Sequence, residues 1–447
     1  MDFKNIQVGK LLPASHTGLV AGLVALILVI LVQRCFNAVF YPILYNEDGR
    51  QMVAWFVNNP HPGEIFRFYA GYTSLFPNLI GYLSVTVFPL PVVPYLFVAV
   101  SLSLAVGALS IFSLKRFRFI MPDDRSRALV CLLIALFPLG NHALITSLTF
   151  CIWNLFFMAL LLLLAPLPES RASRAGLFVF ISLAIVSNPS SVLFIPICIA
   201  LFFIRRGRGE RIFLAGIALV AVVYSVAGVT KTLDPARLDA GLFRMAMEGI
   251  GQRVVFEPLL GNNLRVILFE AQHSSVIHYL AWCLAAGVLF LVLNNLRHPA
   301  LKNKLPMFGF VGYLIVSLTV IAVLGRLDMY GDLLAVRWGQ RYFFSQQMLF
   351  VFIAVSFAVI AVDWKGMSVA ARSALLVLLV GYGLYLNVHH RFFFQTSKKE
   401  GQTVARFLRD AEQRLNEGPR DPNSPREIVL NRRDEWNIRI KLPDESD

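Results

Sequence analysis

Long apolar runs recur along this chain from residue 17 to residue 388, with no gap large enough for an ordinary soluble domain. In a bilayer every backbone polar group must be hydrogen-bonded within the protein, so such runs fold as helices and not as open strands or loops. Of the 447 residues, 57% are hydrophobic and 15% are charged, whereas soluble domains carry about 25% charged residues. The sequence therefore predicts an all-α polytopic membrane protein.

A membrane-spanning helix needs about 20 apolar residues, because each residue rises about 1.5 Å through roughly 30 Å of hydrocarbon. By this criterion the chain is expected to have about eleven transmembrane helices. We interpret the first as an uncleaved span, since the polar end of this run lacks the small residues of a cleavage site. The predicted ranges are 17–39, 93–114, 128–145, 148–166, 175–188, 190–204, 212–230, 276–295, 306–325, 345–362 and 373–388.

Short clusters of basic residues separate the apolar runs and set the predicted orientation. Membrane proteins carry an excess of Lys and Arg in their cytoplasmic loops. All of these clusters become cytoplasmic if the N-terminus is cytoplasmic and residues 74–91 lie along the outer interface as an amphipathic helix. The clusters also account for the net charge of +14, so no nucleic-acid partner is expected. They lie at 115–127, 171–174, 205–211, 297–304 and 365–372.

The same orientation divides the chain into a transmembrane domain, 1–388, and a small extracytoplasmic C-terminal segment, 389–447. We expect the protein in a bacterial inner (cytoplasmic) membrane, with the N-terminus cytoplasmic and the C-terminus extracytoplasmic. Three outer loops connect the spans on the extracytoplasmic side. They cover about 40–92, 231–275 and 326–344.

Two of these outer segments have informative patterns. In the large loop, the mixed charges between Lys231 and Glu257 are typical of an aqueous surface. In the C-terminal segment, Thr403 to Leu415 has helical periodicity. Residues 427–431 and 436–442 have the composition of two short strands. The C-terminal segment is therefore expected to fold as a small appendage.

The first outer loop holds the most concentrated polar chemistry. Glu47 and Asp48 directly follow the end of the first predicted helix. A carboxylate at this depth can accept a proton from a substrate hydroxyl or bind a divalent cation such as Mg²⁺ or Mn²⁺. Solvated acids that cap a helix at the start of the loop explain these residues equally well, so both interpretations stay open. Arg67, Tyr69 and Tyr72 are the candidate substrate-binding residues of this loop.

A second polar group lies in the third outer loop, at its junction with the following span. Arg337, Arg341 and Tyr342 belong to this group. A guanidinium at Arg341 would sit at headgroup level, where it can bind a phosphate with two parallel hydrogen bonds. An ordinary interfacial belt of Arg and aromatic residues is the alternative. The occurrence of a basic site and an acidic site on the same predicted face favours the phosphate site.

The layout of spans and loops resembles the C-type (GT-C) superfamily of polytopic glycosyltransferases. The first motif is similar to the opening of bacterial integral-membrane proteins placed near that superfamily, and it consists of Glu47-Asp48-Gly49, Tyr69-Ala70-Gly71-Tyr72 and Leu75-Phe76-Pro77. Phe137 to His142, with Trp153-Asn154, resembles their third and fourth spans, and Arg341-Tyr342-Phe343 resembles a late-loop motif. Many members have an acidic residue where this sequence has Asn141 and His142.

The resemblance implies an inverting transfer of a sugar from a polyprenyl-phosphate-linked donor to an extracytoplasmic glycan, lipid or protein. Asp48 or Glu47 would take the proton of the acceptor hydroxyl. Arg341, with Arg67 or Arg337, would hold the departing phosphate, and His142 would join the substrate-binding residues. A polymerase or ligase of surface polysaccharide would use similar carriers. A transporter or flippase of lipid-linked sugars is the non-enzymatic alternative, disfavoured because almost no acidic residue lies inside the predicted spans.

Overall fold

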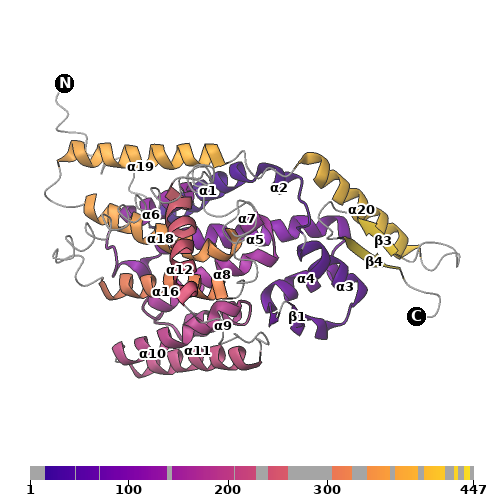
Figure 1. Cartoon of the computed structure of the whole chain (residues 1–447), viewed down its shortest axis with the longest axis horizontal. Helices are drawn as coiled ribbons and strands as arrows, with labels where there is room; N and C mark the ends of the chain where they lie inside the picture. Colours follow the sequence, from indigo (N-terminus) through magenta and orange to yellow (C-terminus); the bar gives the residue numbers. More distant parts are fainter. Residues whose placement is uncertain are drawn as a thin grey trace.

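The computed structural model describes twelve stretches of the chain. Within them the backbone is mostly helical, and the strands form two small antiparallel hairpins (Figure 1). The predicted all-α class is therefore confirmed for the described residues. These residues are 16–45, 47–69, 71–137, 143–205, 207–227, 240–259, 305–324, 340–362, 368–390, 397–417, 427–430 and 437–442.

The elements fall into three groups along the sequence. The helices of the first half of the bundle are α1 (His16–Arg34), α2 (Phe36–Phe40), α5 (Val93–Ser110), α6 (Asp124–Leu136), α7 (Ala143–Thr146), α8 (Ile152–Leu164), α9 (Arg171–Ile185), α10 (Phe194–Ile204) and α11 (Arg208–Ala227). The second half has α12 (Ala240–Gly249), the π-helix η11 (Ile250–Phe256), α16 (Leu305–Leu324), α18 (Gln340–Val362) and α19 (Val369–His390). The C-terminal segment has α20 (Lys398–Asn416), β3 (Glu427–Leu430) and β4 (Ile438–Lys441).

The first outer loop has its own short elements between α2 and α5. It begins with the π-helix η3 (Asp48–Ala54), which continues as α3 (Trp55–Asn58). A 3-10 turn and a two-residue hairpin, β1 (Phe68–Tyr69) and β2 (Tyr72–Thr73), follow. Helix α4 (Leu75–Val87) then leads through the 3-10 turn η5 (Leu90–Val92) into α5.

Three of the described helices are long and apolar enough to cross a membrane, namely His16–Arg34, Leu90–Ser113 and Arg208–Ala227. Helices α9 and α10 are together long and apolar enough to cross a membrane, but the two are bent by 120° relative to each other. If this pair is counted as one broken span, the described residues have four. Membrane-spanning helices are thus supported, and the number of about eleven stays a prediction. The predicted span 276–295 lies outside the described residues. Helix α6 ends at Leu136, short of the predicted residue 145, because Phe137 precedes a proline and such residues disfavour helix.

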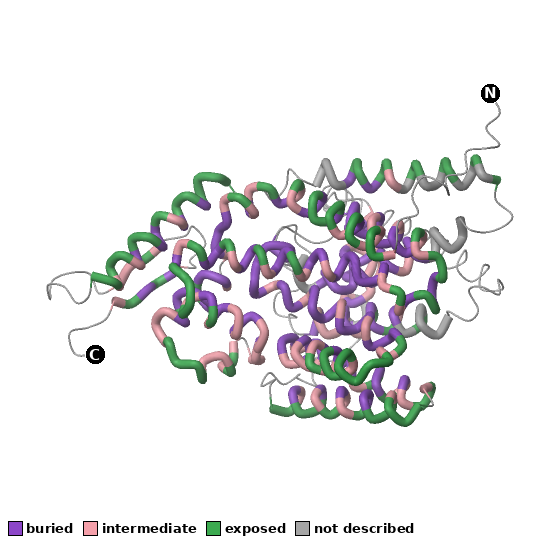
Figure 2. The backbone as a smooth tube through the Cα atoms, turned by 180° about the vertical axis from the view of Figure 1, so that it is seen from behind, coloured by how far each residue is buried: buried purple, intermediate pink, exposed green. Residues whose placement is uncertain are grey.

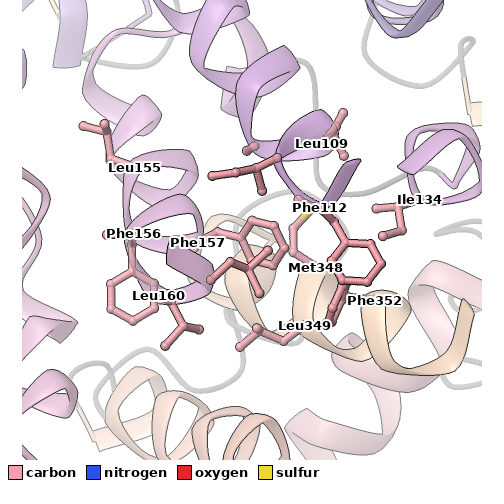
Figure 3. Close-up of a cluster of buried hydrophobic side chains, with 14 of the residues drawn as sticks. Leu109, Phe112, Ile134, Leu155, Phe156, Phe157, Leu160, Met348, Leu349 and Phe352 are labelled. Atoms are coloured by element: carbon pink, nitrogen blue, oxygen red, sulfur yellow. The ribbon is translucent and has the colours of Figure 1, made fainter. Parts of the chain in front are cut away.

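The core of the bundle lies where helices from both halves of the chain meet (Figure 3). Phe112, which follows α5, packs edge-to-face on Phe352 of α18, with ring centroids 4.9 Å apart. Phe156 and Phe157 of α8 are fully buried in the same cluster. Figure 2 shows this buried centre and the more exposed outer helices. Beyond its first turn, α11 exposes large apolar side chains such as Leu219 and Val226, of which Val226 is 79% exposed, as expected of a surface that faces lipid.

Three of the five predicted basic clusters, at 115–127, 171–174 and 205–211, meet at one end of the bundle, which we call the basic end. Arg116 donates to the carbonyl of Pro166, just after α8. Arg205, after α10, donates to the carbonyls of Leu163 and Leu164 at the end of α8. Arg174 of α9 donates to the carbonyl of Pro168. Three clusters that are well separated in the sequence therefore share one end, as the orientation rule requires.

Asp124 joins three segments at this basic end. Its carboxylate accepts hydrogen bonds from Arg118 at 3.0 Å and from His16 at 2.9 Å, and it also pairs with the fully buried Arg127. The hydrogen bonds from Arg118, Arg127 and His16 hold the pKa of Asp124 well below its usual range. The contacts fix the start of α1 against the start of α6.

We expect Asp124→Asn to lower the free energy of unfolding by about 1.5 kcal/mol, because it weakens charge-assisted hydrogen bonds but keeps one acceptor oxygen. Thermal unfolding in detergent at pH 7 measures this loss. Asp123→Asn is the matched control, because Asp123 only caps the start of α6 through Ser126. Equal stability of wild type and Asp124→Asn would contradict the assignment.

Helix α4 has the reverse of the usual surface pattern. Its buried residues are the small or polar Pro77, Asn78, Gly81 and Ser84. Its exposed side includes the apolar Leu83 and Val87, of which Val87 is 65% exposed. A helix with its polar face turned toward the protein and its apolar face outward suits the predicted position along the membrane interface.

The C-terminal segment folds as the sequence predicts. Helix α20 begins at a capping box in which Ser397 and Glu400 satisfy each other's backbone amides. Strands β3 and β4 pair antiparallel, with Leu430 opposite Ile438. This segment and the first loop share one hydrophobic core. Two segments with a common core lie on the same side of a membrane, so the chain must cross any membrane an even number of times between them.

The large loop departs from its prediction. Residues 240–259 form α12 and η11, which pack against α16 and α18. Arg253 and Glu257 are both buried and form an ion pair of 2.9 Å, and Gln347 of α18 donates to the carbonyl of Arg253. The interpretation of these charges as an aqueous surface is therefore wrong for Arg253 and Glu257. Each charge has a partner within its own helix, which offsets the cost of burying it.

Candidate functional site

Asp48 is a buried acid that the protein holds tightly. Its side chain is 1% exposed and accepts four hydrogen bonds from the turn between α7 and α8. Oδ1 accepts from Ser147 Oγ at 3.0 Å, from Thr149 N at 2.9 Å and from Thr149 Oγ1 at 2.7 Å. Oδ2 accepts from Leu148 N at 3.2 Å. The carboxylate therefore joins the first loop to a segment about one hundred residues away in the sequence.

The local sequence explains this contact. Ala143 to Thr146 forms α7, and the chain then turns into the 3-10 turn η8 (Thr149–Cys151) that begins α8. The first amides of a helix have no partner within it and carry partial positive charge. Asp48 supplies the acceptor from a distant segment, as a capping side chain would. Asp48 also starts a π-helix, a rare element that is frequent at functional sites.

Burial dominates the electrostatics of this carboxylate. It raises the pKa of Asp48 to about 6, while the hydrogen bonds from Thr149 and Ser147 lower it and the neighbouring Glu47 raises it. Asp48 therefore titrates near neutral pH, where an acid can change charge during a reaction cycle. Glu47 is only half-buried, so the two adjacent acids occupy different environments.

Arg67 follows the 3-10 turn Pro62–Phe66 and contacts Gln51, which lies within one turn of Asp48 on η3. Its guanidinium donates to the backbone carbonyl and to the side chain of Gln51. It also stacks on Trp55, 4.3 Å from the ring centroid, and lies 5.4 Å from the ring of Phe56. Burial lowers the pKa of Arg67 to about 10, so it stays positively charged at neutral pH. The structure thus places a fixed cation against η3, the helix that Asp48 begins.

The two predicted tyrosines form the hairpin next to Arg67. Tyr69 and Tyr72 are register partners of β1 and β2, and Gly71 has the positive φ of 86° that the tight turn requires. The hairpin is held by Tyr224 of α11, whose hydroxyl donates to the carbonyl of Thr73 at 2.7 Å. The hairpin therefore lies where α11 ends.

The start of α4 is attached to the turn between α9 and α10. Ser74 Oγ donates to the carbonyl of Ser187 at 3.2 Å. The amide of Phe76 donates to Ser187 Oγ at 2.9 Å. The first loop therefore covers the ends of α8, α9 and α11 that lie opposite the basic end. We call this side of the bundle the loop end.

The structure brings some of the predicted residues together and says nothing of others. Glu47, Asp48, Arg67, Tyr69 and Tyr72 lie on one compact loop. Helix α18 begins at Gln340, so the backbone of Arg341 and Tyr342 lies in its first turn, and their side chains are outside the described residues. Arg337 and His142 also lie outside the described residues.

The predicted divalent cation at Glu47 and Asp48 stays a prediction. The described residues contain no group of three His, Cys, Asp or Glu side chains that could hold an ion. The oxygens of Asp48 already accept hydrogen bonds from the protein, and Mg²⁺ or Mn²⁺ would require further oxygen ligands around them. We therefore derive no step through a metal.

Sequence reasoning missed two groups of polar residues. Ser147 and Thr149 hold Asp48, and the available signal was the polar run Thr146-Ser147-Leu148-Thr149 at the junction of the predicted spans 128–145 and 148–166. Arg253 and Glu257 have the i, i+4 spacing of an ion pair on a helix. That spacing is equally typical of a solvated helix, so burial could not be predicted from it.

Comparison with known proteins adds no relative to this description. No family model matches the sequence, and no curated protein or solved structure is significantly similar to the chain. The functional interpretation therefore depends on the geometry of the loop end.

Proposed function

We propose that this protein is a membrane glycosyltransferase that moves a sugar from a polyprenyl-phosphate-linked donor to an extracytoplasmic acceptor. The observation that carries the proposal is the buried Asp48. It directly follows Glu47, has a pKa raised to about 6 by burial, and begins the helix whose Gln51 accepts hydrogen bonds from the cationic Arg67. The same loop thus carries a positioned pair of acids and a positive charge, and sugar transfer from a phosphate leaving group uses a base and a cation.

The geometry suggests different roles for the two acids. Asp48 uses both oxygens to hold the Ser147 to Thr149 turn, so its proposed role is to position the site. Glu47 is the half-buried neighbour and is the proposed base that takes the proton of the acceptor hydroxyl. Arg67, joined by Arg341 at the start of α18, would stabilise the negative charge that develops on the departing phosphate.

The proposed orientation places this chemistry at the outer face of a bacterial inner membrane. Two observations support it. Three basic clusters lie together at the end of the bundle opposite the first loop, and cytoplasmic loops carry the excess of Lys and Arg. Helix α4 turns its apolar side outward beside the loop end. A polyprenyl chain would then lie among the apolar helices, with its sugar at the loop end.

Glu47→Gln tests the proposed base. We expect the rate of sugar transfer in membranes supplied with donor to fall by about 10²-fold or more, because the amide cannot accept the proton. Glu169→Gln is the control, since Glu169 is an exposed acid at the basic end, far from the first loop. The control should transfer sugar at the wild-type rate. Full activity of Glu47→Gln would remove Glu47 from the mechanism.

One observation favours the transporter alternative. Arg253 and Glu257 form a buried ion pair in contact with α18, and ionisable residues inside membrane proteins often mark a substrate pathway. If the protein moves lipid-linked sugars without transferring them, proteoliposomes should show flux of the lipid-linked sugar with no sugar-transfer product. A transfer product that is formed by wild type and disappears in Glu47→Gln would support the glycosyltransferase over the transporter. The length of that product would distinguish the addition of a single sugar from polymerisation.

A further inference from the structure

The C-terminal segment covers the helix that carries Asp48. In Figure 1, α20 and β4 lie beside the elements of the first loop, and Figure 2 shows buried residues beneath the exposed face of α20. The segment contributes six fully or almost fully buried residues to the core that it shares with the first loop. These are Val404, Phe407, Leu408, Ala411, Ile438 and Ile440.

The tightest contact of this core is at Gly49, the residue after Asp48. A Cβ atom added to Gly49 would lie 2.3 Å from Cδ1 and 2.8 Å from Cγ1 of Ile438. Ile438 is fully buried. The side chain of Ile438 therefore lies directly on the backbone of η3, with room for only a hydrogen atom on Gly49.

Polar contacts fix β4 and α20 on both sides of this point. Asn58, the last residue of α3, donates from Nδ2 to the carbonyl of Arg439 at 3.1 Å and accepts at Oδ1 from the amide of Lys441 at 2.8 Å. In this way Asn58 satisfies the free edge of β4 as a neighbouring strand would. Glu412 of α20 accepts from the amide of Leu90 at 3.2 Å. The contacts join residues more than 300 positions apart.

We propose that the C-terminal segment is a positioning element of the candidate site. Strand β4, through Ile438, presses on Gly49 and fixes η3 so that Glu47 and Asp48 keep their places opposite the turn at Ser147. The catalytic consequence rests on the proposed glycosyltransferase function, whereas the contact itself does not. Ile438 is therefore a positioning residue, because it touches the backbone of η3.

A double-mutant cycle of Gly49→Ala and Ile438→Ala tests the contact. Gly49→Ala adds a methyl group that collides with Ile438, and Ile438→Ala leaves a cavity over η3. The double variant places the added methyl group in the space that the isoleucine vacates. Both single variants should lose function, and the double variant should recover much of it, since residues in contact show large coupling. Val429→Ala, on the partly exposed β3 of the same sheet, is the control.

Two measurements separate the contact from its catalytic effect. The first is the rate at which a membrane-impermeant maleimide labels Val404→Cys, a buried position of α20; each variant is made in this background and labelled in membranes of the full-length protein. Labelling should be slow in the parent and the control, at least about tenfold faster in both single variants, and slow again in the double variant. The second is sugar transfer, where the single variants should show turnover reduced about tenfold or more with an unchanged KM for the donor.

The outcomes are distinguishable. Labelling and turnover that both follow the cycle support the proposal. Single variants that label as slowly as the parent would overturn it. Labelling that follows the cycle while turnover stays at the wild-type value would also overturn it, because the segment would then be attached without positioning the site. If the parent protein, Val404→Cys, transfers no sugar from any polyprenyl-phosphate donor, the proposed function fails. Labelling that does not follow the cycle would reject the contact between Gly49 and Ile438, whatever the result of the transfer assay.

Discussion

Asp48→Ala is expected to destabilise the loop end and to abolish sugar transfer together, so it cannot serve as a clean test of catalysis. The carboxylate is the acceptor for two side-chain hydroxyls and two backbone amides. The hydroxyls of Ser147 and Thr149 can rotate toward other acceptors, whereas the amides of Leu148 and Thr149 cannot. A buried donor without a partner costs about 1–3 kcal/mol, so the two amides together should lower the free energy of unfolding by about 3 kcal/mol.

The free thiols of the protein provide the measurement. Cys151 is buried beside Asp48, and Cys35, Cys131 and Cys198 are buried elsewhere in the bundle. A thiol-reactive fluorogenic dye therefore reports unfolding during heating. Asp48→Asn is the matched variant: its Oδ1 can still accept from Ser147 and Thr149, whereas its Nδ2 cannot accept from the amide of Leu148. It should therefore lose about 1.5 kcal/mol, half of the loss in Asp48→Ala. Equal stability of Asp48→Ala and wild type would show that the four hydrogen bonds do not hold the loop end.

The difference in stability between wild type and Asp48→Asn is also expected to depend on pH. Because burial raises the pKa of Asp48 to about 6, the folded protein binds a proton at this site more tightly than the unfolded chain, whose Asp pKa is about 3.9. The contribution of Asp48 to stability is therefore greatest below about pH 4 and is lost as the pH rises through about 6. The difference in stability between wild type and Asp48→Asn should shift in favour of wild type on going from pH 7 to pH 5. A shift in the opposite direction would mean that hydrogen bonding outweighs burial.

Gly401→Ala is expected to displace the start of α20 from the first loop. A Cβ atom added to Gly401 would lie 2.5 Å from the carbonyl oxygen of Tyr41 and 2.8 Å from its carbonyl carbon. The obstacle is backbone at the end of α2, so neither side can relax by a change of side-chain rotamer. Overpacking of this kind costs about 1–3 kcal/mol, and a backbone obstacle places the expected cost at the upper end of that range.

Faster maleimide labelling of Val404→Cys in the Gly401→Ala background would measure this displacement. Gly176→Ala is the control, because Gly176 lies within α9 and an added Cβ would meet no atom within 4 Å. In α9 the alanine should leave labelling unchanged and stabilise the helix by about 0.5–1 kcal/mol. If Gly401→Ala labels at the rate of Gly176→Ala, the close approach of α20 to Tyr41 does not exist in the membrane-bound protein.

Local patterns were sufficient to predict much of the fold. Hydrophobic runs predicted the helical class, and helical periodicity between Thr403 and Leu415 predicted α20 to within a few residues at each end. The placement of basic residues predicted which helix ends lie together at Asp124 and Pro166. These features depend on the chemistry of short segments, which a sequence states directly.

The partners of the candidate site could not be predicted in this way. Asp48 stands next to Glu47 in a pattern that fits a solvated cap or a catalytic acid equally well, and only the fold brings it to Ser147 and Thr149. The contact between Gly49 and Ile438 depends on the path of the whole chain between them. Long-range contacts of this kind leave no periodic signal, so sequence reasoning identified the acid and missed the groups that control it.

The core shared by Phe56, Leu408 and Ile440 also constrains biosynthesis. Chains are synthesised from the N-terminus, so the first loop emerges long before the residues that complete its packing. Until the last strand arrives, the loop exposes apolar surface that other proteins in the same compartment can bind. Premature termination before residue 397 should therefore yield a membrane-inserted chain that quality-control proteases recognise by its uncovered loop.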